Sequence, residues 1–173
     1  IRGWLGYVPQ DSFLFSKSIK ENILFGKYEA TDEELRAAIQ LADFEKDLSQ
    51  LPEGLNTLVG EKGVALSGGQ KQRISIARAL IKDPEILLLD DSLSAVDAKT
   101  EKTIIGNIQR ERAGKTTIIV THRLSAVQHA NKIIVLENGK IIEAGTHHSL
   151  LNNGGWYKEQ FERQQIEEEM EEK

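Results

Sequence analysis

One short run of residues combines a helix start with two glycines, in the order Leu66-Ser67-Gly68-Gly69-Gln70. Ser67 is a suitable N-cap, and Gln70 lies three positions after it, so the two residues make a Ser-x-x-Gln capping box. The glycines have no Cβ, which lets a phosphate group approach the backbone closely. A helix that begins there directs its positive end at the same point. The run predicts an anion site, although an ordinary capped helix is the simpler alternative for these residues alone.

A pair of carboxylates, Asp90 and Asp91, follows directly after the apolar run Ile86-Leu87-Leu88-Leu89. The apolar run is typical of a parallel strand that is buried on both faces. In α/β folds, ligand-binding groups lie at the carboxyl ends of such strands. Carboxylate oxygens suit Mg²⁺, which keeps most of its water ligands. The sequence therefore predicts that Asp90 holds a magnesium ion, mostly through water.

These motifs resemble those of ABC-type ATPases, and the resemblance covers nearly the whole chain. The signature run continues in the family's pattern through Ala77-Arg78-Ala79-Leu80, and further family elements follow in the right order. Gly6 to Ser16 is similar to the Q-loop of ABC exporters, and Thr57 to Gly63 to the loop with which exporters contact their membrane domains. The resemblance implies that the signature residues bind ATP in trans, across a dimer interface.

The resemblance also implies roles for single residues. Gln10 reaches the nucleotide's Mg²⁺ and the attacking water, and Asp90 is the Walker B aspartate. His122, in a stretch similar to the H-switch, lies near the γ-phosphate and stabilises its charge. A stretch similar to the D-loop crosses the dimer interface, with Val96 where Leu is commoner, and consists of Ser94, Ala95, Val96 and Asp97. The expected cofactors are ATP and Mg²⁺.

Asp91 departs from the family's pattern, because most members carry Glu at this position as the general base. Asp is shorter by one methylene, or roughly 1.5 Å, whereas general-base catalysis needs hydrogen-bond reach of about 2.6–3.2 Å. We therefore expect slow hydrolysis at the site built with Asp91, as in one half of heterodimeric exporters. Two alternatives stay open: a small backbone shift that makes Asp91 a working base, and a non-catalytic regulatory nucleotide-binding module.

The sequence contains no Gly-x-x-x-x-Gly-Lys-Ser/Thr phosphate loop. In the family this loop lies N-terminal to the point that corresponds to Ile1, so we interpret the chain as the C-terminal part of a nucleotide-binding domain. We expect this fragment alone to be inactive. The expected partners are a second nucleotide-binding domain, in a heterodimer, and the membrane domains of an exporter at the cytoplasmic face of the cell membrane.

The coarse pattern predicts an α/β fold, namely a partial P-loop NTPase core with parallel strands and a helical signature subdomain. Capping boxes at Ser18 and Thr31 predict short helices, and Asn138-Gly139 predicts a hairpin. Thr116 to Thr121 reads as a second buried strand, and without the phosphate-loop strand we expect both buried strands to have an uncovered edge. The expected organisation is a core strand and Q-loop (1–12), the helical subdomain (13–83), the C-terminal half of the core (84–150), and a C-terminal helix with an acidic tail (151–173).

Composition sets broad limits on function. The chain has 173 residues, a formal net charge of -5 and no cysteine, which makes nucleic acid an unexpected partner and excludes disulfides. A non-transport ABC ATPase, for example in DNA maintenance, is the alternative class. Those proteins carry long coiled-coil insertions, whereas only 56 residues separate Gln10 from Ser67. The favoured function is therefore ATP binding and hydrolysis that drives an ABC exporter.

Overall fold

The computed structural model describes residues 3–61 and 63–171, apart from the side chain of residue 171, so Ile1, Arg2, Lys62, Glu172 and Lys173 lie outside the described residues. The chain divides into two compact units, Ile1–Val120 and Thr121–Lys173. Each unit has its own apolar core. The described part of the chain has no helix that is both long and apolar enough to cross a bilayer.

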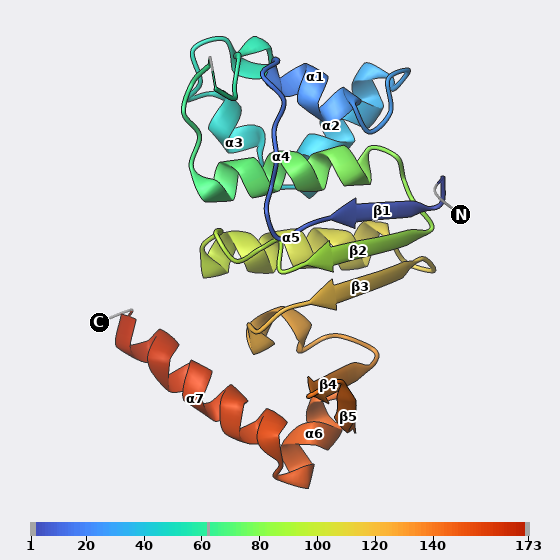
Figure 1. Ribbon diagram of the computed structural model, residues 1–173, viewed down its shortest axis with the longest axis vertical. Helices are drawn as coiled ribbons and strands as arrows, with labels where there is room; N and C mark the ends of the chain where they lie inside the picture. The colour runs from blue at the N-terminus through green and yellow to red at the C-terminus, as the bar shows by residue number, and fades with distance from the viewer. Residues whose placement is uncertain (1–2, 62, 172–173) are drawn as a thin grey trace. The chain divides into compact units, whose positions relative to one another are not determined.

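The first unit is built on a parallel sheet of order β1-β2-β3, which confirms the predicted α/β class (Figure 1). Strand β1 is Leu5–Val8, β2 is Ile86–Asp90 and β3 is Thr116–Val120. Leu5 pairs with Ile86, and Ile86 pairs with Thr116, so the three strands run in step. The carboxyl ends of all three strands therefore lie at one edge of the sheet.

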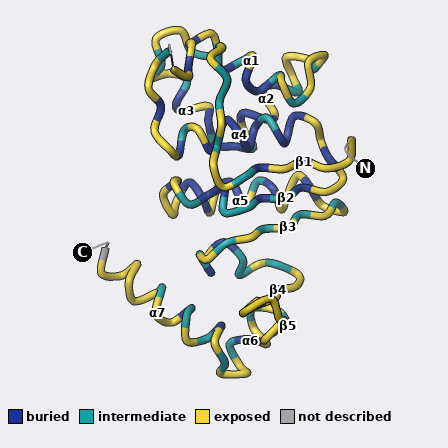
Figure 2. Tube along the Cα trace, viewed as in Figure 1, coloured by how far each residue is buried: buried dark blue, intermediate teal, exposed yellow. Residues whose placement is uncertain are grey.

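Helices fill the connection between β1 and β2. They are α1 (Ile19–Leu24), α2 (Asp32–Leu41), α3 (Glu45–Leu48), the 3-10 turn η1 (Gly54–Asn56) and α4 (Gly68–Leu80). Capping boxes begin α1, α2 and α4, as the sequence predicts. Helix α5 (Ala98–Glu111) connects β2 to β3. The buried faces of α4 and α5 share one core with Leu87 and Leu89 of β2 (Figure 2).

The prediction that β2 and β3 are buried on both faces is wrong. Along β2, Leu87 and Leu89 are buried, whereas Ile86 is 38% exposed. Along β3, Ile118 is 48% exposed and Val120 is 51% exposed. Successive side chains of a strand point to opposite faces, and among the described residues of the first unit the helices pack on one face of this sheet. Several apolar side chains of β2 and β3 are therefore exposed on the other face.

The predicted uncovered edge is also partly wrong. Strand β2 is central, because it pairs with β1 on one side and with β3 on the other. Among the described residues the edge strands of this sheet are β1 and β3. The uncovered edge predicted at β2 therefore does not exist, and the expectation holds for β3 only.

The second unit contains η2 (Leu124–Val127), an antiparallel pair of β4 (Ile133–Glu137) and β5 (Lys140–Gly145), then α6 (His147–Asn153) and α7 (Trp156–Glu171). Asn138 and Gly139 join the two strands with φ of 49° and 75°, the left-handed values that a tight hairpin turn needs. The core of this unit consists of Leu124, Ile133, Val135, Leu150, Tyr157 and Phe161.

Candidate functional site

The candidate site begins where β1 and β2 end. Asp90 is the last residue of β2, and its Oδ2 accepts a hydrogen bond of 3.2 Å from the hydroxyl of Tyr7 on β1. The side-chain amide of Gln10 donates to Asp91 Oδ2 at 3.3 Å. The structure thus brings together Gln10, Asp90 and Asp91, although Gln10 lies about 80 positions before the two aspartates. They meet because parallel strands end at the same edge of the sheet.

Tyr7 is a neighbour of Asp90 that the sequence did not reveal. Desolvation, followed by the hydrogen bond to Asp90 and the charge of its carboxylate, raises the pKa of Tyr7. The hydroxyl therefore stays protonated and donates to Asp90 at neutral pH. Its position in strand β1 could have been predicted only from the register of β1 against β2.

Asp91 has a left-handed backbone, with φ of 46°. This region is uncommon for residues other than glycine, but Asp and Asn adopt it more readily than most. The amide N–H of Asp91 donates to the carbonyl of Val120 at 2.8 Å, which extends the ladder between β2 and β3 by one bond. The chain reverses direction immediately after this bond, and the side chain of Asp91 turns toward Gln10.

The signature residues form the start of α4 as predicted. Ser67 is the N-cap, its Oγ accepts from the amide of Gln70 at 3.2 Å, and Gln70 Oε1 accepts from the amide of Ser67 at 3.0 Å. Leu66 is buried in the core, whereas Ser67 and Gly68 are exposed. The first amides of a helix have no partner within the helix. The N-terminus of α4 therefore combines an exposed surface, backbone donors and no side chain at Gly68.

Gly69 has a packing role in addition to the one that its motif suggests. It is buried, and a Cβ at this position would lie 2.8 Å from the carbonyl oxygen of Ala95. Gly68 is less constrained, because its Cβ would meet the Cβ of Ala95 at 3.1 Å. Gly69 thus allows the first turn of α4 to lie directly against the loop that contains Ser94, Ala95, Val96 and Asp97.

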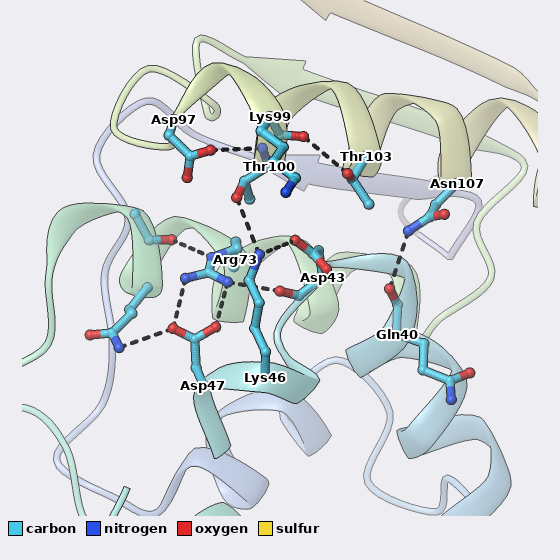
Figure 3. A network of polar contacts seen from close by, with 12 residues as sticks. Gln40, Asp43, Lys46, Asp47, Arg73, Asp97, Lys99, Thr100, Thr103 and Asn107 are labelled. Carbon is cyan, nitrogen blue, oxygen red and sulfur yellow. Dashed lines mark hydrogen bonds and ion pairs between the residues drawn. The ribbon is translucent and has the colours of Figure 1, made fainter. Parts of the chain in front are cut away.

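A buried ion pair supports this helix start from the side of α3. Arg73 donates to both carboxylate oxygens of Asp47, to Oδ1 at 2.8 Å, and Gln70 Nε2 donates to the same Oδ1 at 3.1 Å (Figure 3). Both charged side chains are about nine-tenths buried, at 9% and 10% relative exposure. The guanidinium also lies 5.5 Å from the centre of the Phe44 ring. Asp47 therefore holds two residues of the signature helix at once.

A second polar contact joins α3 to the start of α5. Lys46 Nζ lies 3.4 Å from Thr100 Oγ1 and 2.7 Å from Asp43 Oδ2 (Figure 3). Asp97 is the N-cap of α5, and its Oδ1 accepts from the amide of Thr100 at 2.9 Å. That backbone hydrogen bond is the main reason why the pKa of Asp97 is lowered. Asp97 is thus the charged N-cap of α5, and its carboxylate accepts a hydrogen bond from the first turn of its own helix.

The segment after Gln10 is anchored by Arg78 of α4. The guanidinium donates to the carbonyl of Phe13 at 2.9 Å, and to the carbonyl and side-chain oxygens of Asn22 at 2.8 and 2.9 Å. Asn22 is buried and exchanges hydrogen bonds with the backbone of Phe15. Burial lowers the pKa of Arg78, which still leaves the group charged at neutral pH. These contacts connect the Q-loop segment to the signature helix.

The loop from Thr57 to Gly63 packs against the start of α1. The amide of Val59 donates to the carbonyl of Lys17 at 3.0 Å, and Val59 is buried. Leu58 is 57% exposed beside it. Lys62, which belongs to this predicted contact loop, lies outside the described residues. The described part of the loop therefore combines an anchored residue with an exposed apolar one.

His122 belongs to the second unit. Its carbonyl accepts a hydrogen bond of 2.7 Å from the side chain of Gln164 on α7, and the same Gln164 accepts from the amide of Leu124 at 2.9 Å. Its side chain is exposed. The structure describes this residue within its own unit, and within the first unit it brings Gln10, Asp90 and Asp91 together.

The donor set at this edge fits magnesium and phosphate. Asp90 supplies a carboxylate at the end of the central strand, and the side-chain oxygen of Gln10 is a second hard oxygen ligand. Gly68, without a Cβ, leaves the backbone donors of α4 accessible. A parallel sheet with carboxylates at the end of its central strand, next to a capped helix that begins with glycines, is the arrangement of an α/β nucleotide-binding ATPase.

Comparison with known proteins agrees with this class. The sequence model of the ABC transporter family matches residues 1–94, which is more than half of the chain, and the chain therefore belongs to that family. The matched region includes the Q-loop segment, the signature run and the two aspartates Asp90 and Asp91, and it ends at Ser94, within the stretch similar to the D-loop.

Relatives of known type are similar over nearly the whole chain. A probable multidrug resistance ABC transporter ATP-binding/permease protein, YheI of Bacillus subtilis, is 69% identical over 96% of this chain and 28% of its own length. The multidrug resistance-like ATP-binding protein MdlA of Buchnera aphidicola is 53% identical over 98% of this chain and 29% of its own. The chain thus spans less than a third of either relative.

A solved structure shares the fold. The structure of a bacterial Atm1-family ABC exporter with ATP bound superposes with a TM-score of 0.89 at 44% identity, and covers 94% of this chain and 29% of that chain. The fold, the motifs and these relatives all indicate part of the nucleotide-binding domain of an ABC exporter.

Proposed function

We propose that this chain is the C-terminal part of a nucleotide-binding domain that binds and hydrolyses ATP to drive export through a membrane. The single observation that carries the proposal is the meeting of Gln10, Asp90 and Asp91 at the carboxyl edge of the sheet. The relatives support the exporter assignment, since two of them have names that refer to multidrug resistance. The proposed location is the cytoplasmic face of the cell membrane.

The predicted site residues would have the following roles. Asp90 holds Mg²⁺ through water, with Tyr7 orienting its carboxylate and Gln10 as a further ligand. When bound, the ion supplies positive charge that neutralises the phosphate oxygens. Asp91 orients the attacking water next to Gln10. His122 stabilises charge on the γ-phosphate, and the start of α4 does so in trans.

Two kinds of partner follow from this proposal. A second nucleotide-binding domain receives the signature residues Leu66 to Gln70 and faces Ser94 to Asp97. Membrane domains contact the Q-loop segment and the loop from Thr57 to Gly63, where Leu58 is exposed beside the anchored Val59. The relatives named ATP-binding/permease proteins are consistent with membrane domains in the same polypeptide.

Asp91 indicates a heterodimer with unequal sites. Its left-handed backbone is held by the bond to Val120, so a shift that extends its reach toward the water is resisted. An error of about 1 Å in position costs up to about a hundredfold in rate. We propose that this subunit builds a slow site and donates an intact signature to a fast one. The partner would then carry Glu after its Walker B Asp and a degraded signature.

The test is ATP turnover of the reconstituted pair. Gly68→Asp should lower kcat by about a hundredfold or more, because it removes contacts to the transition state. Asp91→Asn should change turnover by less than about twofold, and Asp91→Glu should raise it, because the longer side chain regains reach. Asp83→Asn is the matched control, since Asp83 is also left-handed, with φ of 47°, at the opposite end of β2. If Asp91→Asn stops turnover as completely as Gly68→Asp, Asp91 is a working base.

The isolated chain should bind nucleotide very weakly and hydrolyse none. The phosphate loop, whose backbone amides and Lys cradle the phosphates in such ATPases, is absent from these 173 residues. Isothermal calorimetry with Mg-ATP checks this expectation, and a micromolar dissociation constant would contradict it.

A regulatory nucleotide-binding module is the second candidate function, and Asp91 is the observation that favours it. The two candidates differ in one measurement. If the chain is part of an exporter subunit, Gly68→Asp lowers the substrate-stimulated ATP turnover of the complete pair. If it is part of a regulatory module, Gly68→Asp leaves that turnover unchanged.

A further inference from the structure

Gln72 is a buried polar residue of α4 to which no motif assigns a task. Only 4% of the residue is exposed. Its Nε2 donates to Ser94 Oγ at 3.1 Å, and its Oε1 accepts from the amide of Ala95 at 2.9 Å. Both ends of the amide are therefore used by consecutive residues of one loop.

The orientation of the Gln72 amide follows from its partners. A backbone N–H can only donate, so the atom that faces Ala95 must be the oxygen, and the nitrogen faces Ser94. The hydroxyl of Ser94 accepts from Gln72 and donates its own proton to the carbonyl of Asp91 at 2.9 Å. A directed chain of hydrogen bonds thus runs from Gln72 through Ser94 to the backbone of Asp91.

This chain of hydrogen bonds ends at a residue with an uncommon backbone conformation. Asp91 has φ of 46°, and its two backbone groups are held from opposite sides. Its amide donates to Val120 in β3 at 2.8 Å, and its carbonyl accepts from Ser94. Uncommon backbone conformations persist where the surroundings determine them from several directions. Gln72 is part of those surroundings although it lies on a different element.

The same helix carries the signature residues. Gln72 is three positions after Gly69, which itself packs against the carbonyl of Ala95. The loop 94–97 therefore meets the first turns of α4 at two points, one packed and one hydrogen-bonded. A displacement of the start of α4 must either carry Ser94 and Ala95 with it or break both hydrogen bonds to Gln72.

We propose that Gln72 is a positioning residue that couples the signature turn of α4 to the backbone of Asp91 through Ser94. The inference rests on the proposed function, in which the start of α4 serves one ATP site and Asp91 belongs to the other. Gln72 then communicates between the two sites within one subunit, without touching either nucleotide. Its amide is needed because only a group that donates and accepts at once can satisfy Ser94 and Ala95 together.

The first test is hydrogen exchange at the amide of Ala95 in the complete transporter, which reports the bond to Gln72 directly. Gln72→Met keeps the length of the side chain and removes both polar ends. It should speed exchange at Ala95 by about tenfold, the order expected for one lost hydrogen bond. Gln72→Glu keeps an acceptor and should leave Ala95 protected. Gln40→Met, on the exposed side of α2, is the matched control and should change nothing.

The second test separates positioning from folding. Gln72→Met should lower kcat for ATP by about tenfold, because the start of α4, which serves the fast site, loses its hold on Ser94 and Ala95. Nucleotide affinity should change by less than about twofold. Ser94→Ala breaks the same chain of bonds, so the double variant should lose no more turnover than the worse single variant. Unchanged exchange at Ala95 in Gln72→Met, or losses that multiply in the double variant, overturns the proposal. Turnover that survives Gly68→Asp overturns the proposed function instead, and exchange at Ala95 still decides the role of Gln72.

Discussion

At the scale of single residues, the buried polar side chains around α4 constrain how this helix packs on its neighbours. Arg73 and Asp47 form an ion pair at about one-tenth exposure, and Gln70 shares the carboxylate. A buried pair contributes little compared with an apolar replacement, but the loss of one partner strands the other charge. The pair therefore acts as a constraint on how α3 and α4 meet, and it includes a residue of the signature.

Asp47→Asn should lower the free energy of unfolding by about 3–5 kcal/mol, because the guanidinium of Arg73 stays buried without its counter-charge. Replacing both residues, as Asp47→Leu with Arg73→Met, should cost less than Asp47→Asn alone. Urea denaturation of the chain measures both. Lys20→Gln is the control, since its pair with Asp32 is exposed and joins atoms 3.7 Å apart, and it should change stability by less than about 0.5 kcal/mol. Equal losses for Asp47→Asn and Lys20→Gln would contradict the role of the buried pair.

The sequence predicts residues of the site where a local pattern carries the information. The capping box of Ser67 and Gln70 follows from spacing alone, and so does an aspartate at the end of an apolar strand. Gln72 and Asp47 could not be predicted, because their partners lie 22 to 26 positions away and depend on how the helices pack. The meeting of Gln10 with Asp91, 81 positions apart, followed only from the resemblance to a family.

At the scale of elements, the close approach of α1 and α4 depends on one glycine. Gly26 follows α1, and a Cβ there would lie 2.0 Å from the carbonyl oxygen of Arg78 and 2.9 Å from Ile81 Cγ2. Gly106, within α5, has no atom within 4 Å of its Cβ position and has no positive φ. The sequence shows both only as glycines, and the difference between them follows from the contact between α1 and α4.

Gly26→Ala and Gly106→Ala should therefore shift stability in opposite directions. Gly26→Ala forces α1 away from α4 and should cost at least about 1–3 kcal/mol, as overpacking does. Gly106→Ala reduces the freedom of the unfolded chain and should add about 0.5–1 kcal/mol. Thermal unfolding of the two variants beside the parent chain provides the comparison, and a shift of the same sign in both would show that the packing argument is wrong.

At the scale of the whole molecule, the sheet of the first unit has one apolar face that the described residues of that unit leave exposed. In register across the strands lie Leu5 with Ile86, and Tyr7 with Leu88 and Ile118. Of these, Leu5, Tyr7, Ile86 and Ile118 are 36% to 50% exposed. The sequence predicted buried strands because apolar composition reports what a strand is suited to, whereas burial depends on which elements cover it.

This face gives the last prediction, which is that the 173-residue chain self-associates. An edge strand offers unpaired backbone groups, and β3 adds the exposed side chains of Ile118 and Val120 beside that edge. The double variant Ile118→Thr with Val120→Thr keeps strand propensity, because Thr is also β-branched, and removes apolar surface. Sedimentation velocity at two concentrations should show assembly of the parent chain and a larger monomer fraction of the double variant. Ile141→Thr is the control, since Ile141 is a strand residue of β5 that is even more exposed, at 62%, but lies outside the sheet of the first unit, and it should leave assembly unchanged. A parent chain that sediments as one monomeric species at both concentrations, with a single sharp melt, would show that the exposed face does not drive association.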